Sequence, residues 1–324
     1  MVQLLKIKEL VFQYVSRFEI YVLAAIRFAI AFTAFTMINR HVGFMGVLKE
    51  YPVALIFALL CSFLPAGMMM FLAAVMILVH FYALSIELCA IAALLFIILF
   101  CLYLRFSVRK GLYVMLTPIF GAYGIPYIMP VSAGLLSKPY TAISVVCGTV
   151  VYFFLRNVEK SAALFTTDGD MVSSSVLTLA ITQIFGDKEM YLYLIAFAAT
   201  TIVVFCVCKL KMNHARTIAA LLGVVVQLVI ICAGEIYFGN NGALVRIIIG
   251  CIVSAFILLG VDFASMSLDY SRVEKTQFED DEYYYYVKAV PKSSVPVAKK
   301  QVKKINAKKI RSWSPAKIIK KYKQ

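Results

Sequence analysis

Long apolar stretches, separated by short polar or turn-forming segments, dominate the first 268 residues. A helix that spans a bilayer needs about 20 apolar residues. Continuous apolar runs, as opposed to alternating ones, favour helices over a barrel. The pattern therefore predicts an all-α fold, a polytopic helical membrane bundle. The clearest predicted spans are 20–38, 88–105, 190–208, 217–237 and 243–263.

Turn signals divide two longer apolar regions and add further spans. Pro65 interrupts the block 51–84, although whether this block forms one span or two stays open. Prolines and glycines between residues 126 and 139 divide the region 112–155. The spans added in this way are 51–64, 68–84, 112–129, 140–155 and the short, Ser/Thr-rich 171–186, which brings the predicted number to ten.

The placement of Lys and Arg supports ten spans with both termini in the cytosol. Cytosolic flanks of membrane proteins carry excess basic residues, and this arrangement assigns eleven to the inner flanks and five to the outer loops. Without a crossing by 171–186, either the basic tail or the cluster Arg105–Lys110 would fall outside. The predicted location is the bacterial inner (plasma) membrane.

Composition agrees with a membrane domain and offers no sign of catalysis. Hydrophobic residues make up 62% of the chain, against 45–50% in typical soluble domains. Residues 1–19 mix charged and apolar positions, which predicts an amphipathic cytosolic helix and no cleavable signal peptide. The eight cysteines lie in apolar segments without metal-ligand spacing. No catalytic motif appears, so we predict no enzyme activity, cofactor or metal.

A few residues within the apolar segments are candidates for an intramembrane polar site: Arg27, Pro118, Pro126, Gln227 and Glu235. A charge at membrane depth is costly and marks function unless it snorkels or pairs internally. Prolines loosen the run 117–130, and broken helices occur only inside protein or beside a watery cavity. The alternatives are a kinked helix followed by an outer re-entrant hairpin, and interhelical hydrogen bonds that only hold helices together.

His80 lies near the outer end of the third predicted span, with Glu87 in the loop beyond it. Such a pair suits a proton relay. The alternative is a histidine that is simply hydrogen-bonded within the protein.

The segment after residue 268 changes character twice. Residues 269–287 carry a net charge of −4 and include four consecutive tyrosines, whereas residues 288–324 carry thirteen basic and no acidic residues. A basic segment beside a membrane binds anionic headgroups at about 1 kcal/mol per residue. A strand-prone acidic and tyrosine segment suits a protein partner. The candidate binding residues are Tyr283, Tyr284, Lys303, Lys304, Lys308, Lys309, Arg311 and Trp313.

Ten spans followed by a cytosolic segment resemble the membrane region of the stage II sporulation protein E phosphatase family. The resemblance covers residues 1–268 at most, and the chain lacks the phosphatase domain, so no catalytic residue carries over. The stretch FEDDEYYYYVKAVPK is similar to the juxtamembrane ending of uncharacterised bacterial multi-pass proteins.

Three functions compete. The first is a non-enzymatic scaffold or regulator whose tail binds the inner leaflet or a protein partner. Formation of homo-oligomers stays open, and binding of nucleic acid is disfavoured. The second is a permease with a pathway near the broken segment 117–130. A lipid-modifying enzyme is third, because the outer loops offer little acid–base chemistry. The predicted domains are an N-terminal segment 1–19, a transmembrane domain 20–268 and a tail 269–324.

Overall fold

The computed structural model describes residues 11, 14–107, 110–167, 182, 186–210, 212, 214–265, 274–279 and 284–289. The chain divides into two compact units, Met1–Met266 and Ser267–Gln324. Each unit is described in turn.

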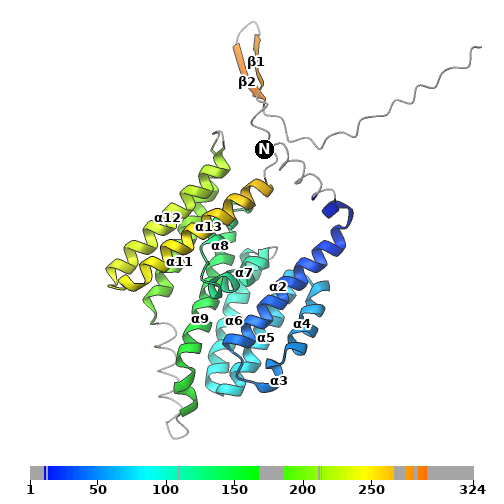
Figure 1. Ribbon diagram of the computed structural model, residues 1–324, viewed down its shortest axis with the longest axis vertical. Helices are drawn as coiled ribbons and strands as arrows, with labels where there is room; N and C mark the ends of the chain where they lie inside the picture. The colour runs from blue at the N-terminus through cyan, green and yellow to red at the C-terminus, as the bar shows by residue number, and fades with distance from the viewer. Residues whose placement is uncertain are drawn as a thin grey trace, which may run out of the picture. The chain divides into compact units, whose positions relative to one another are not determined.

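Helices make up the first unit throughout its described residues (Figure 1). They are α2 (Glu19–His41), α3 (Gly46–Lys49), α4 (Tyr51–Phe63), α5 (Ala66–Leu84), α6 (Ile86–Phe106), α7 (Gly111–Ala122), α8 (Ile128–Leu136), α9 (Thr141–Thr167), α11 (Lys188–Cys208), α12 (Ala215–Tyr237) and α13 (Leu244–Ser265), with a 3₁₀ turn η2 at Asn241–Ala243.

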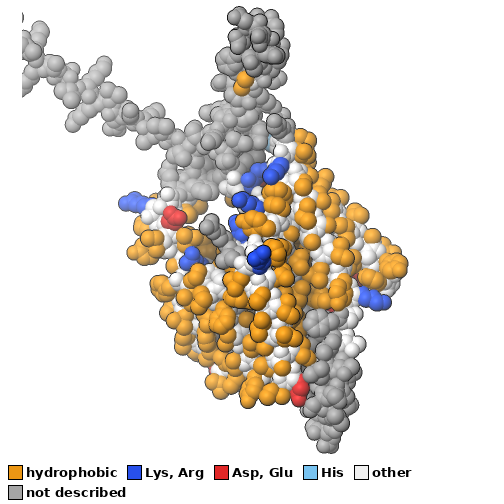
Figure 2. Space-filling view, turned by 180° about the vertical axis from the view of Figure 1, so that it is seen from behind, with side chains coloured by type: hydrophobic (Ala, Val, Ile, Leu, Met, Phe, Trp, Pro, Cys, Tyr) orange, Lys and Arg blue, Asp and Glu red, His pale blue; other side chains and the backbone are white. Residues whose placement is uncertain are grey.

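Seven of the described helices are long and apolar enough to cross a bilayer: α2, α5, α6, α9 over Thr141–Ala162, α11, α12 and α13. Their outward side chains are largely hydrophobic, as Figure 2 shows for one side of the molecule. Apolar exposure on this scale suits lipid and not water. These observations confirm a helical, multi-pass membrane protein, but not the predicted number of ten spans.

The predicted break at Pro65 is confirmed, so the block 51–84 forms two helices. Pro65 has an extended backbone (φ −67°, ψ 156°) and directly precedes α5. Proline fixes φ and lacks an amide hydrogen, so it suits the start of a helix and disfavours its interior. The preceding α4 has 13 residues, which is short for a complete crossing.

Contacts between helix ends define two faces of the first unit. The near face is where α2 begins; the start of α12 and the end of α13 lie at the same end of the bundle (Figure 1), and there the Arg216 side chain of α12 donates to Asp262 of α13 at 3.3 Å. The far face is where α2 ends; there His41 lies 3.0 Å from Glu159 of α9. One or two residues separate α4 from α5 and α5 from α6, so these helices alternate between the faces.

Helices α7 and α9 run in the same direction, away from the near face. Ser144, near the start of α9, donates to the Ser107 hydroxyl just before α7 at 2.7 Å. Further along, the Tyr152 ring of α9 lies against Gly121 at the end of α7. Two parallel helices that follow one another in the chain require a return segment between them.

Helix α8 is that return segment. Ser137, directly after α8, donates to the hydroxyl of Tyr113 in the first turn of α7 at 3.4 Å. The start of α7 and the end of α8 therefore lie side by side, at the same level of the bundle. Gly124, with φ of 78°, supplies the left-handed conformation in the connecting turn. We describe α7–α8 as a re-entrant hairpin that enters from the near face and turns near the middle of α9.

This hairpin explains why ten spans are not confirmed. The predicted span 112–129 turns back instead of crossing, so 140–155 traverses in the direction opposite to that predicted. Lys138 then lies on the near face and Lys160 on the far face. The predicted span 171–186 falls, apart from Thr182 and Gly186, outside the described residues.

Two large clusters of buried side chains and a small third one, formed by Tyr103, Val114 and Cys147, make up the core of the first unit. One large cluster joins α2, α4, α5 and α6 with parts of α7 and α9 and includes Phe35, Phe81 and Phe154. The other joins α8, α11, α12 and α13 with part of α9 and includes Tyr127 and Phe197. The hairpin and α9 contribute to both large clusters, so they connect the two halves of the bundle.

The second unit contains a two-stranded antiparallel sheet. Strand β1 (Glu274–Glu279) pairs with β2 (Tyr284–Ala289), with Glu274 opposite Ala289 and Glu279 opposite Tyr284. A short β-ribbon is a departure from the predicted all-α fold. Its strands coincide with residues that have high strand propensity, such as the tyrosines of β2.

Candidate functional site

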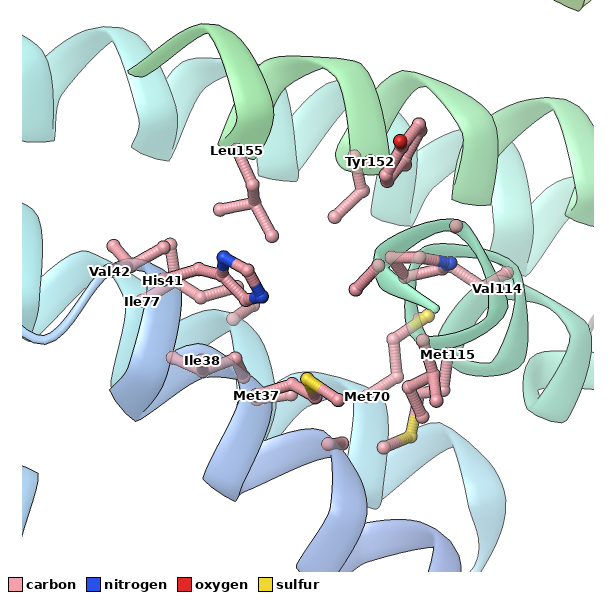
Figure 3. A pocket seen from close by; sticks show the side chains of 18 of the residues that line it. Met37, Ile38, His41, Val42, Met70, Ile77, Val114, Met115, Tyr152 and Leu155 are labelled. Atoms are coloured by element: carbon pink, nitrogen blue, oxygen red, sulfur yellow. The ribbon is translucent and has the colours of Figure 1, made fainter. Parts of the chain in front are cut away.

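A cavity of about 280 Å³ lies between α2, α5, α6, α7 and α9. Figure 3 shows side chains from these helices around an open space, with the His41 ring turned toward it. Most of its wall is apolar, which is typical of small-molecule sites in proteins. Lining residues include Met37, Ile38, Met70, Ala74, Ile77, Phe96, Phe100, Val114, Met115, Pro118, Ile119, Val151, Tyr152 and Leu155.

Charged side chains gather at the far-face end of this cavity. His41, Arg156 and Glu159 all belong to its lining. The His41 Nδ1 atom lies 3.0 Å from both carboxylate oxygens of Glu159. Arg156 donates from a terminal nitrogen to Glu189 of α11 at 3.1 Å. The cavity is therefore amphipathic, with an apolar body and one charged end.

A hydrogen-bonded group of polar side chains continues from Arg156 toward α12. The amide nitrogen of Asn240 lies 2.9 Å from Glu189 and 2.9 Å from Glu235, so it donates to both carboxylates. Asn157 donates to Asp187 at 3.2 Å. Glu235 is 1% exposed and has no ion pair among the described residues. This group ties the ends of α9, α11 and α12 together.

The tip of the hairpin lies against α12. The fully buried Gln227, near the middle of α12, donates from Nε2 to the backbone carbonyl of Tyr127 at 3.1 Å. The Tyr127 hydroxyl lies 3.2 Å from that of Tyr193 in α11. The Thr200 hydroxyl and Gln227 Oε1 are buried without a hydrogen-bond partner in the described part of the chain. The protein buries the hairpin from Pro126 to Leu135, whereas Ala122, Tyr123 and Gly124 in the turn are exposed.

Comparisons with known proteins identify no relative. No family model, curated protein or solved structure matches this chain. The resemblance to the sporulation phosphatase membrane region therefore stays a prediction. Among the described residues, no three side chains of the metal-binding types gather in one place.

The structure brings together some of the predicted intramembrane site residues and separates others. Pro118 lines the cavity, and Pro126 lies in the hairpin turn beside the residue that Gln227 binds. Glu235 belongs to the polar group at the far face, two turns from Gln227 along α12. Arg27 is half-buried in α2 and does not line the cavity. One polar site containing all five is not formed.

The predicted tail residues cannot be compared in the same way. Tyr284 begins strand β2, and only its backbone is described. Outside the described residues lie Tyr283, Lys303, Lys304, Lys308, Lys309, Arg311 and Trp313.

The charged end of the cavity was not predicted from the sequence. Arg156 was expected in a cytosolic flank, because the predicted number of crossings between α2 and this residue differs by one from that in the structure. The spacing of Arg156 and Glu159 on one helix puts both on the same side, and this was an available signal. Their meeting with His41, 118 residues away from Glu159, depends on packing that local patterns do not encode.

His80 is explained by its hydrogen bonds. It is fully buried, its Nδ1 accepts from the backbone amide of Met45 at 3.2 Å, and its Nε2 lies 3.1 Å from Asn39 Oδ1. Asn39 in turn donates to the Leu48 carbonyl at 2.8 Å. These bonds fasten the turn after α2 to α5, which agrees with the hydrogen-bonded alternative over the relay.

Proposed function

We propose that this multi-pass membrane protein is a permease, which binds a small amphipathic molecule in the cavity beside the re-entrant hairpin. The observation that carries the proposal is the position of the cavity. Its wall includes Pro118 and its neighbours in α7, the same segment whose broken helix pointed to a pathway in the sequence. Discontinuous helices beside a site within the membrane are characteristic of transporters.

The hairpin also supplies a means of coupling the two halves of the bundle. Its first arm, α7, lines the cavity. At its tip, Tyr127 accepts a hydrogen bond from Gln227 of α12 and lies against Tyr193 of α11. Alternating access commonly involves movement of one bundle against another around a fixed site. Movement of α12 would therefore be transmitted to the cavity wall through Tyr127 and α7.

We further propose that the near face is cytosolic. Apart from Arg27, which lies within α2, the described basic residues of the first unit divide equally between the faces, with Arg17, Arg105, Lys110, Lys138, Lys209 and Arg216 on the near face and Arg40, Lys49, Arg156, Lys160, Lys188 and Arg246 on the far face. The orientation therefore depends on the strongly basic segment 288–324 that follows α13, since basic flanks stay in the cytosol. Scaffolding through that tail is the alternative, and no described residue supports it.

Photolabelling tests the binding step. A hexanol that carries a diazirine should label residues of the cavity wall, such as Met37 and Met115, when the protein is in lipid nanodiscs. Ala74→Phe fills part of the cavity and should reduce this labelling severalfold, because Ala74 lines it. Ala83→Phe, on the exposed side of the same helix, is the matched control. Labelling confined to lipid-facing residues, or unaffected by Ala74→Phe, would contradict the proposal.

A further inference from the structure

The charged end of the cavity brings together two carboxylates, those of Glu159 and Glu189, with the guanidinium of Arg156 and the imidazole of His41. Arg156 is already paired with Glu189, at 3.1 Å, so its positive charge is compensated. Glu159 has His41 as its only partner in the described part of the chain. When His41 is neutral, the carboxylate of Glu159 leaves this end of the cavity with one net negative charge.

A further carboxylate, that of Asp187, lies near this end. Asp187 accepts hydrogen bonds from Asn157 and from the backbone amide of Glu189, and has no ion pair among the described residues. Clefts lined by one sign of charge attract ligands of the opposite sign.

The neutral part of the wall is compatible with a cation as well. Phe96, Phe100 and Tyr152 line the cavity. These rings lie in the body of the cavity, so they can contact the hydrocarbon part of a ligand whose cationic head lies near Glu159.

We propose that the occupant of this cavity is an amphipathic cation, a small hydrophobic molecule with one ammonium-type group directed toward Glu159. An anion of the same shape would have to compete with Glu189 for Arg156 and would lie close to the carboxylate of Glu159. This inference rests on the proposed function, because it specifies the ligand of the same cavity. It adds the charge of the ligand and names Glu159 as the residue that selects it.

The test uses three competitors with one hydrocarbon chain and different heads: hexyltrimethylammonium, hexanesulfonate and 1-hexanol. Each is titrated against the diazirine-hexanol photolabel, with the full chain in nanodiscs of zwitterionic phosphatidylcholine. Hexyltrimethylammonium should suppress labelling at about tenfold lower concentration than hexanesulfonate, which corresponds to one partly screened charge interaction. Equal suppression by the cation and the sulfonate would overturn the inference.

Three variants assign the preference to Glu159. In Glu159→Gln, the concentration of hexyltrimethylammonium that halves the photolabelling should rise to the concentration of hexanol that does so. The value for hexanol should not change. Glu159→Asp keeps the charge and should keep the preference. Glu50→Gln removes an exposed carboxylate of the far face that does not line the cavity, and should have no effect. A cation preference that survives in Glu159→Gln would overturn the role of Glu159.

Failure of the inference can be told apart from failure of the proposed function. If hexanol competes with the photolabel but hexyltrimethylammonium and hexanesulfonate do so equally well, the cavity binds ligands and only the preference for a cation is wrong. If Ala74→Phe has no effect on labelling, the binding function itself is wrong. Proteoliposomes that contain the unmodified protein should take up radiolabelled hexyltrimethylammonium severalfold faster than proteoliposomes that contain Ala74→Phe. Binding without uptake would contradict the proposed permease function.

Discussion

Gly134→Leu should lower the free energy of unfolding by about 3 kcal/mol or displace the hairpin, because α8 has no room for a side chain there. A Cβ atom on Gly134 would lie 2.7 Å from the Cβ of Val204 and 2.8 Å from the backbone carbonyl oxygen of Thr201. Backbone cannot rotate away as the end of a flexible side chain can. A thermal or denaturant titration of the purified protein in detergent gives the free energy of unfolding, and its difference from that of the unmodified protein measures the loss.

The matched control for this variant is Gly260→Leu. Gly260 is also helical, in α13, but it is exposed and nothing lies within 4 Å of its Cβ position. Leucine has a higher helix propensity than glycine, so this change should be neutral or slightly stabilising. If Gly134→Leu were as stable as the control, α8 would not pack against α11, and the hairpin would be wrong.

His80→Ala should destabilise the protein by about 3 kcal/mol, for two physical reasons. Loss of a large, fully buried ring leaves a cavity, and its partners Asn39 and Met45 lose hydrogen bonds that water cannot easily replace. The same unfolding titration measures the change.

Tyr82→Ala is the matched control for His80→Ala. Tyr82 is two residues away on α5 and 65% exposed, so its removal should cost much less. Equal losses in the two variants would mean that the hydrogen bonds of His80 do not stabilise the turn after α2.

The sequence predicted the parts of the fold that depend on local chemistry. Runs of apolar residues gave the long helices, and Pro65 gave the break between α4 and α5, because hydrophobicity and proline geometry act over a few residues. Part of the broken segment 117–130, including Pro118 and Ile119, lines the cavity.

The direction of the chain through the segment 112–139 was not predictable from the same signals. A re-entrant hairpin and a crossing helix both lie in a hydrophobic environment, so their side chains are equally apolar. The difference depends on close approach at small residues, such as Gly121 against Tyr152 and Gly134 against Val204. Those contacts join residues far apart in the sequence, and span counting cannot detect them.

The same error hid the charged end of the cavity. Counting 112–129 as a crossing put Arg156 on the face opposite to His41, so their approach could not be foreseen. Two of the five predicted site residues, Gln227 and Pro126, lie near each other, which agrees with the tendency of polar and helix-breaking residues to be enclosed together because they are costly in lipid. A charged Arg27 side chain is equally costly in lipid, but no described contact pairs it with another residue.

The central structural claim is that α7 and α8 turn back within the membrane, and cysteine accessibility tests it most directly. Lys138→Cys and Lys160→Cys are introduced singly into a chain whose eight native cysteines are replaced, and intact cells are treated with a membrane-impermeant maleimide. Lys209→Cys and Lys49→Cys serve as references for the near and far faces. The hairpin predicts that position 138 is labelled like position 209 and position 160 like position 49. The reverse pairing would contradict the account.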